Sequence, residues 1–93
     1  MKIKDGLLLR ALGDSHVVVP VGQAAIDLRG MISLNGTGAF LWECLQTPQT
    51  EDSLVRALTE RYAVERDVAS ADVTRFLEIL REHALLEERE EEV

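Results

Sequence analysis

The hydrophobic and polar residues of this chain change their spacing after residue 34. Residues 7–12 and 15–20 are short apolar runs separated by a Gly-Asp pair, a pattern typical of a β-hairpin. Residues 31–34 form a further short extended run, and residues 21–30 fit either a separate strand or an extension of a neighbouring one. The first part of the sequence therefore predicts a small antiparallel sheet.

From residue 40 onward, apolar residues recur with the spacing of an α-helix. A broad apolar arc over residues 40–45 predicts a mostly buried first helix, which Asn35 or Thr37 caps. Thr50 is a good N-cap for a second helix, and the two acidic residues after it favour the positive end of the helix dipole. Only Asn35 and the Gly-Thr-Gly segment of residues 36–38 separate the extended run over residues 31–34 from the first helix, so the chain passes from strand to helix without a linker.

A third helix is predicted after a connection over residues 63–69. Ser70 or Asp72 opens this helix, which extends to about residue 85. Its core-facing stripe repeats at i, i+4, i+7 and i+11 and consists of Val73, Leu77, Leu80 and Ala84. The order β-β-β-α-α-α is that of an α+β domain in which a small sheet packs on a three-helix unit.

A second strip of side chains flanks this stripe on the third helix. Asp72, Phe76, Ile79 and His83 share one side of the helix, so the strip has both apolar and polar members. In one interpretation, Phe76 and Ile79 pack under the sheet or against the second helix. In the other, they form one wall of a groove beside an unpaired strand edge, where an extended peptide can bind by adding a strand. The helical spacing alone leaves both interpretations open.

The composition is that of one folded domain. The chain has 93 residues, of which 46% are hydrophobic and 29% are charged. No apolar run approaches the roughly 20 residues that span a bilayer, and no secretory signal core is present. A single cysteine, Cys44, fits a reducing cytoplasm. We expect a cytoplasmic domain over residues 1–88, without a membrane partner, and a solvated acidic tail over residues 89–93.

The sequence predicts no catalytic residue, no cofactor and no metal site. His16 and His83 lie far apart in the chain, and no HxH, HExxH, CxxC or phosphate-loop motif occurs. Cys44 lies on the apolar side of the first helix, which favours a small buried residue over a nucleophile. Arg75 and Arg81 are balanced by neighbouring acids and the net charge is −7, so nucleic acid is not an expected partner.

Four stretches of the chain resemble, in order, the PqqD-like family, also called RiPP recognition elements. They are VVVPVG, GMISLNGTGAFLWECL, TEDSLVRALTERYAV and DVTRFLEILREHALLEE, and the similarity covers residues 7–88. Each stretch is a packing pattern, so the specificity of the match lies in their order and spacing. The resemblance implies a winged helix-turn-helix-like α+β fold, with a three-stranded antiparallel sheet followed by a three-helix bundle, used for peptides instead of DNA.

The resemblance also implies a binding site. In that family, the leader segment of a ribosomally made precursor peptide adds as a strand beside the third strand, here residues 29–34. It lies in a cleft against the third helix, here residues 71–85. Carried onto this chain, the peptide-binding residues are Leu28, Arg29, Met31, Ile32, Ser33, Leu34, Asp72, Arg75, Phe76, Ile79, Leu80 and His83. The strip found from the helical spacing falls on the same helix.

The sequence therefore favours a non-catalytic adaptor that binds a leader peptide. It would present the precursor peptide to a modifying enzyme, such as a radical SAM maturase, a leader protease or a cyclase. One alternative is an oligomerising domain that buries the same strand edge against a second copy, as a homodimer. A DNA-binding winged helix protein ranks third because the acidic chain repels a polyanion, and an enzyme ranks last.

Overall fold

The computed structural model of the protein describes residues 1–21 and 32–88. Its strands and helices are, in chain order, β1 (Lys2–Ile3), β2 (Leu7–Leu12), β3 (Ser15–Pro20), β4 (Ile32–Leu34), α2 (Gly36–Cys44), α3 (Glu51–Arg61), α4 (Arg66–Glu82) and β5 (Leu86–Glu87). The predicted α+β fold, with a three-stranded antiparallel sheet followed by three helices, is confirmed. The short strands β1 and β5, which the sequence pattern does not predict, pair with each other.

β2 and β3 form the predicted hairpin with the predicted bounds. They pair antiparallel over all six residues of each strand. Gly13, in the turn, has a φ of +64°, a backbone conformation that favours glycine. β4 pairs with the other side of β3, so the sheet order is β2-β3-β4. The residues 22–31, which include the start of the predicted third strand, lie outside the described residues.

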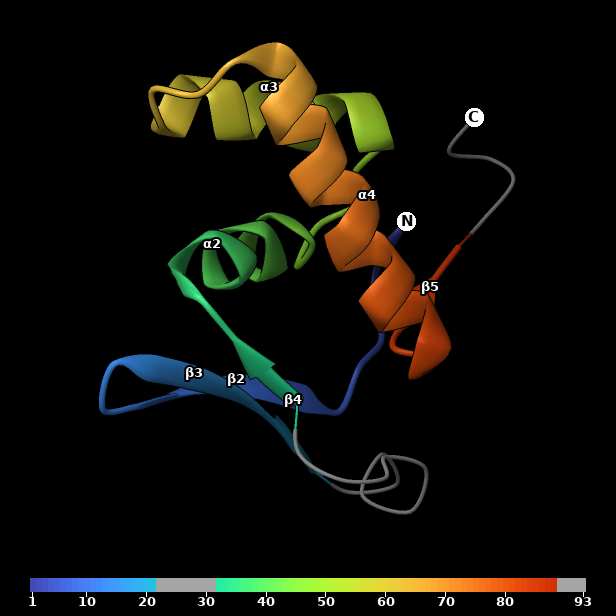
Figure 1. Ribbon diagram of the computed structural model, residues 1–93. Coiled ribbons are helices and arrows are strands. Elements are labelled where there is room, and N and C mark those ends of the chain that lie inside the picture. Colours follow the sequence, from blue (N-terminus) through green and yellow to red (C-terminus); the bar gives the residue numbers. More distant parts are fainter. Residues whose placement is uncertain (22–31, 89–93) are drawn as a thin grey trace.

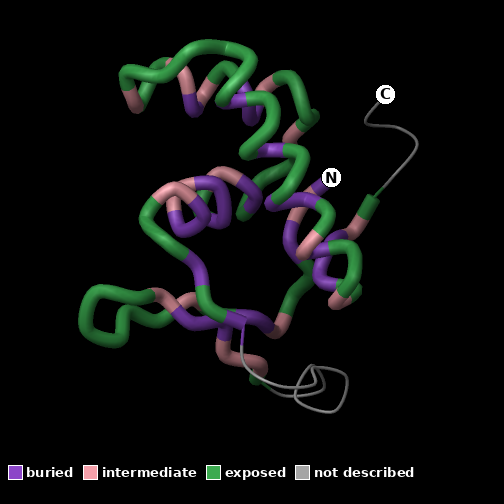
Figure 2. Tube along the Cα trace, viewed as in Figure 1, coloured by how far each residue is buried: buried purple, intermediate pink, exposed green. Residues whose placement is uncertain are grey.

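The three helices lie on one side of this sheet (Figure 1). Side chains alternate between the two faces of a strand, and β4 follows this rule: Ile32 and Leu34 are buried, whereas Ser33 is exposed. Val18, opposite Ile32 on β3, is also buried. Figure 2 shows the buried positions where strands and helices face each other, and exposed positions at the hairpin tip. The inner face of the sheet therefore closes one side of the core.

The centre of the core lies among the helices. Its seven largest fully buried side chains come from α2, α3, α4 and the residue that follows α2, and they are Leu41, Leu45, Leu54, Leu58, Val73, Leu77 and Leu80. Three of the four residues in the predicted stripe of the last helix are therefore confirmed as core. Burial of each such side chain contributes roughly 1.5–3 kcal/mol to folding relative to its exposure, so this cluster fixes how the three helices cross.

Side-chain caps set the starts of the first two helices. Asn35 is the cap of α2: its Oδ1 accepts a hydrogen bond from the Gly38 backbone N–H at 2.8 Å. Of the two caps that the sequence allowed, Thr37 is instead inside the helix. Thr50 caps α3 as predicted, and it exchanges reciprocal hydrogen bonds with Ser53 in a capping box.

The last helix begins earlier than the sequence pattern predicts. α4 starts at Arg66, so residues 66–69 are helical and the predicted connection over 63–69 is mostly wrong. Its N-cap is Glu65, which makes no side-chain capping hydrogen bond, whereas Ser70 is a favourable cap residue that lies within the helix. The buried side chain of Ala69 holds the extra turn against the core, and no local capping signal marks that contact.

The same helix ends earlier than predicted. α4 ends at Glu82, and Ala84 has a φ of +55° and is exposed, so its place in the core stripe was wrong. The Ala84 N–H donates to the Arg81 carbonyl at 3.0 Å, and the Leu85 N–H donates to the Leu80 carbonyl at 2.9 Å. This is a Schellman motif, which usually has glycine at the left-handed position. With alanine there, the sequence gives no signal of the helix end.

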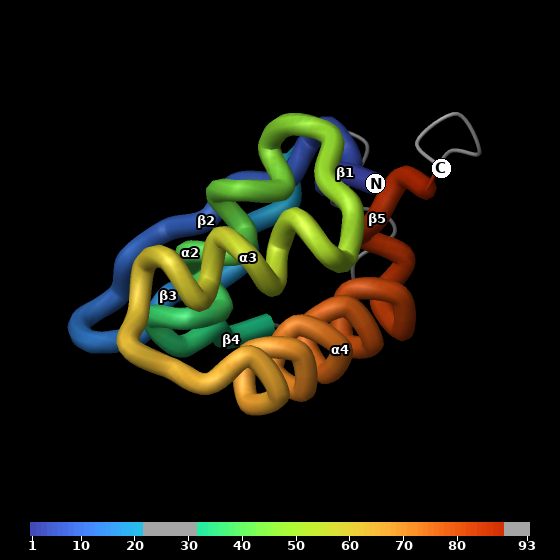
Figure 3. The backbone as a smooth tube through the Cα atoms, turned by 90° about the horizontal axis from the view of Figure 1, so that it is seen from above, coloured from blue at the N-terminus to red at the C-terminus, as the bar shows by residue number. Residues whose placement is uncertain are grey.

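The turn after α4 directs the chain into β5, beside the N-terminus. β5 pairs antiparallel with β1, and the Arg81 guanidinium binds the Glu88 carboxylate at 2.7 Å just beyond. Seen from above, α4 extends from its α3 end towards this strand pair (Figure 3). Among the helices of the described residues, none has the length and apolar composition needed to cross a membrane.

Candidate functional site

β4 is an edge strand. Within the described residues it pairs with β3 on one side only. In an antiparallel sheet, alternate residues direct their N–H and C=O groups to opposite neighbours, so β4 directs some of its backbone groups away from β3. An extended peptide can pair with such groups by adding a strand.

The short connection between β4 and α2 explains why residue 38 is a glycine. Gly38 lies in the first turn of α2, and an added Cβ there would lie 3.2 Å from the Leu34 Cβ and 3.4 Å from the Asn35 Oδ1. A larger residue would therefore push the helix start away from the strand end. At Gly36, an added Cβ would meet nothing within 4 Å. The close approach at Gly38 keeps the start of α2 against the end of β4.

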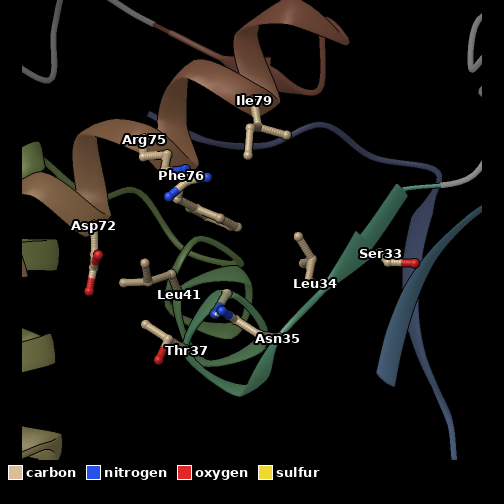
Figure 4. Close-up of a pocket in the computed structure, with 10 residues that line it drawn as sticks. Ser33, Leu34, Asn35, Thr37, Leu41, Asp72, Arg75, Phe76 and Ile79 are labelled. Atoms are coloured by element: carbon tan, nitrogen blue, oxygen red, sulfur yellow. Dashed lines mark hydrogen bonds between the residues drawn. The ribbon is translucent and has the colours of Figure 1, made fainter. Parts of the chain in front are cut away.

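α4 provides a wall opposite this edge. Its inward residues Val73 and Leu77 are fully buried, whereas the flank that begins with Asp72 is turned towards β4 and the start of α2. On this flank Phe76 is only 6% exposed, and Ile79 is half-buried. Figure 4 shows Phe76 and Ile79 pointing into the space between α4 and β4, with Leu34 on the opposite side.

A pocket of about 300 Å³ lies between these elements. Its lining comes from β4, the start of α2 and α4, and consists of Ser33, Leu34, Asn35, Thr37, Gly38, Leu41, Asp72, Arg75, Phe76 and Ile79. We refer to this pocket together with the free edge of β4 as the β4–α4 groove. Both interpretations of the flanking strip therefore hold in part: Phe76 belongs to the core, and it also lines a pocket beside the strand edge.

The pocket brings together half of the residues predicted from the resemblance. These six are Ser33, Leu34, Asp72, Arg75, Phe76 and Ile79. Ile32 and Leu80 are buried in the core and are not among the residues that line the pocket. His83 is the C-cap of α4, outside the pocket, and its Nδ1 lies 2.9 Å from the Ile79 carbonyl oxygen. Leu28, Arg29 and Met31 lie outside the described residues.

The remaining lining residues were not predicted as site residues. Asn35, Thr37, Gly38 and Leu41 come from the helix start that follows β4. Their sequence pattern predicted capping, turning and burial. Asn35 does cap the helix, Gly38 allows the close approach of strand and helix, and Leu41 is buried, whereas Thr37 is not the cap. Their position directly after the strand edge was a usable signal, because a helix that starts at the end of a strand stays beside it.

The pocket combines apolar and charged side chains. Leu34, Leu41 and Phe76 are apolar, and the exposed side chains of Asp72 and Arg75 add one charge of each sign. Among the residues that the structure describes, no group of three or more His, Cys, Asp and Glu side chains could hold a metal ion. The half-buried thiol of Cys44 is not among the lining residues, and burial raises its pKa, with a smaller contribution from the Glu43 carboxylate. A raised pKa means less thiolate and a weaker nucleophile.

Residues 16–86 match the family described as "Coenzyme PQQ synthesis protein D (PqqD)". The chain belongs to the PqqD family. The match runs from within β3 to the first residue of β5, and therefore includes the whole described part of the β4–α4 groove. Among curated proteins, a search finds no match to this sequence.

A solved structure also resembles this PqqD-family chain. It is titled "TbiB1 in Complex with the TbiA(beta) Leader Peptide", has a TM-score of 0.72 and is 25% identical in sequence. The similarity covers 96% of this chain and 98% of that one. The two proteins therefore share their fold over almost their full lengths, and that relative was solved with a leader peptide.

Proposed function

We propose that this PqqD-family protein is a non-catalytic adaptor that binds the leader segment of a ribosomally made precursor peptide in the β4–α4 groove. Three observations support the proposal: the family, the resemblance to a protein solved with a leader peptide, and the pocket beside an unpaired strand edge. The observation that carries it is the pocket, because it has apolar lining residues from α4 and lies beside the strand edge to which a peptide can add.

In the proposed complex, the leader adds as a strand to the free edge of β4. Antiparallel pairing is slightly more stable per residue than parallel pairing, so we expect the leader to run antiparallel to β4 and to continue the β2-β3-β4 sheet. Every second side chain of the leader then lies on the face of Ile32 and Leu34, towards α4. These side chains are the ones that the pocket can receive.

Side-chain burial contributes more to this affinity than backbone pairing. A backbone hydrogen bond contributes about 1 kcal/mol net, because it replaces a bond to water. A fully buried apolar side chain contributes roughly 1.5–3 kcal/mol. β4 is only three residues long, so few backbone bonds form and the apolar anchor sets most of the binding energy after the costs of association.

The second half of the proposal is delivery. In this proposal the protein contributes binding, and the chemistry on the precursor belongs to a separate enzyme. We propose that the bound leader is presented to such an enzyme, for which a radical SAM maturase, a leader protease and a cyclase are candidates. A pull-down with the enzyme encoded beside the precursor gene, with and without the precursor, tests this step.

Amide NMR tests the binding step directly. The isotope-labelled protein is titrated with the leader of the short precursor encoded near its gene, and with a scrambled leader as control. We expect shifts at Ile32–Leu34 and along α4 from Asp72 to His83 with the native leader only. Shifts confined to the β2 edge or to the α3–α4 connection would contradict the groove. A tight dimer in light scattering that the leader does not alter would instead favour the homodimer.

A further inference from the structure

Arg75 differs from the other arginines of the described helices. The others have partners: Arg56 and Arg66 bind Asp52, Arg81 binds Glu88, and Arg61 lies over the ring of Tyr62. For Arg75, no carboxylate of the described residues lies within ion-pair distance. Because five of its N–H groups can donate, its guanidinium is available to a ligand.

The unpaired state of Arg75 is not explained by a lack of acidic neighbours. Asp72 and Glu78 are each three residues away on the same helix, a spacing at which side chains can meet. Neither forms an ion pair with Arg75 in the described structure. Arg75 and Asp72 both line the pocket, and Figure 4 shows their side chains extending in different directions from α4. Arg75 is therefore an exposed arginine at the pocket that forms no ion pair within the described residues.

Charge and apolar surface thus meet at one place in the groove. Phe76 forms part of the pocket wall, and Arg75, adjacent to it in sequence, lines the same pocket. In an added strand, side chains two residues apart point to the same face and lie close enough to occupy neighbouring subsites. One such side chain can pack on the apolar part of the pocket, against Phe76, while the next on that face lies near Arg75.

Accepting the proposed function, we propose that Arg75 is a specificity-determining residue of the groove. It selects leader segments that carry a carboxylate side chain near the bulky apolar residue that fills the pocket. The guanidinium binds the carboxylate with charge-assisted hydrogen bonds, in a fork geometry that a carboxylate matches. The substrate class is therefore an extended peptide with an apolar anchor and an acidic residue on the same strand face, although the protein itself is acidic.

The expected effect is moderate, because Arg75 is exposed and solvent screens its charge. We expect loss of the pair to weaken binding by about two- to fivefold, compared with a larger loss when the apolar anchor is removed. Added salt should reduce the contribution of the pair, since exposed charges are screened within a Debye length of about 8 Å at physiological ionic strength. Salt should leave the apolar anchor largely unaffected.

Selection from a phage-displayed library of random linear peptides tests the inference. The library is selected against the unaltered protein, Arg75→Glu and Arg75→Lys. Arg10→Glu serves as the matched control, because Arg10 is an exposed arginine on β2, the opposite edge of the sheet. We expect the unaltered protein and Arg10→Glu to enrich Asp or Glu at a fixed spacing from an apolar residue. Arg75→Lys should retain this preference more weakly, and Arg75→Glu should enrich Lys or Arg at that position.

The outcomes separate this inference from the proposed function. If Arg75→Glu retains the acidic preference, or if the unaltered protein enriches an apolar residue without any fixed acidic position, the role of Arg75 is wrong and the groove stands. Each selected peptide is also tested for binding to Ile79→Asp. If no selected peptide is weakened by that change, the peptides bind outside the groove, and the proposed function fails together with the inference.

Discussion

Within the described residues, the sheet has two edge strands, β2 and β4, and they differ in what surrounds them. β2 is six residues long, and on it Leu8 and Leu12 are 47% and 64% exposed. Arg10 lies between these two side chains on the same face. β4 is three residues long, its two apolar side chains are buried, and α4 and the start of α2 form a pocket beside it.

The comparison shows that a free edge is not sufficient for a site. Both strands offer backbone groups to an added strand within the described residues, and β2 offers more of them. Proteins commonly place a charged residue on such an edge to discourage unwanted pairing, and Arg10 fits that role. Among the described residues, β4 has a pocket beside it, with apolar side chains from β4, α2 and α4 in its lining, so we expect an added strand to bury its side chains there.

We expect the largest effect from a substitution in the pocket beside β4. Ile79→Asp removes an apolar contact from the wall of the pocket and places a carboxylate there, so we expect leader affinity to fall by about ten- to a hundredfold, equivalent to roughly 1.5–3 kcal/mol. Leu8→Asp makes the same kind of change on the β2 edge and should leave affinity unchanged. Calorimetric titration measures both, with circular dichroism to verify the fold. Equal losses in the two variants would show that the β4 edge has no special role.

A second pair of changes tests the joint that holds β4 beside α2. Gly38→Ala places a methyl group 3.2 Å from the Leu34 Cβ, which belongs to the strand and moves only with it. Overpacking costs about 1–3 kcal/mol, partly offset by up to about 1 kcal/mol from the better helix propensity of alanine. We expect a net loss of stability of about 1 kcal/mol and weaker leader binding.

Gly36→Ala is the control for that joint. An added Cβ at Gly36 meets nothing within 4 Å, so alanine should stabilise the protein by about 0.4–1 kcal/mol through the lower entropy of the unfolded chain. Chemical denaturation gives both values. Stabilisation by Gly38→Ala as well would mean that the strand and the helix start have more room than the structure shows.

A third pair compares two helix caps of similar strength. Asn35→Ala and Thr50→Ala each remove a side-chain cap, from α2 and α3 respectively, and each should cost about 1 kcal/mol of stability. Asn35 lines the pocket and Thr50 does not. Only Asn35→Ala should therefore also weaken leader binding when both variants are measured at a temperature where they are folded. Parallel loss of affinity in both would indicate that overall stability, and not the groove, controls binding.

The structural features that depend on neighbouring residues in the chain could be predicted from the sequence. The hairpin, the free third strand and the Thr50 cap depend on neighbours in the chain, so their residue patterns were sufficient. The bounds of α4 were missed at both ends for a physical reason: Glu65 makes no side-chain cap at its start, and Ala84 replaces the usual glycine at its end.

The candidate site could be predicted only in part. Helical spacing placed Phe76 and Ile79 together on one flank, because that relation is local to α4. It did not show that Leu41 lines the same pocket, since this depends on how α4 crosses α2. Leu80 was included because the resemblance implies a cleft against the helix without naming a face of it; Leu80 is buried in the core and is not among the lining residues. The pairing of β1 with β5 joins two-residue strands from opposite ends of the chain, for which no local pattern exists.

The smallest expected effect concerns a region outside both edges. Asp52 on α3 binds Arg56 at 2.8 Å and Arg66, at the start of α4, at 2.7 Å. The hydrogen bond from Arg66, followed by that from Arg56, lowers the pKa of the Asp52 carboxyl below its ordinary value of 3.8. A carboxyl with a lowered pKa in the folded state stabilises the fold above its ordinary pKa, and this stabilisation is lost as the pH falls through the folded-state value.

Asp52→Asn should therefore destabilise the protein slightly at neutral pH, and the difference from the unaltered protein should shrink in acid. Both charges of each pair are exposed, so the effect is small. Glu60→Gln removes an acid from the exposed side of the same helix, where the described structure shows no ion pair, and serves as the control. Thermal unfolding across the acid range measures the difference. Because this contact joins α3 to α4 away from the pocket, leader affinity should stay constant; a loss of affinity would mean that the position of α4, and hence the wall of the groove, depends on this corner.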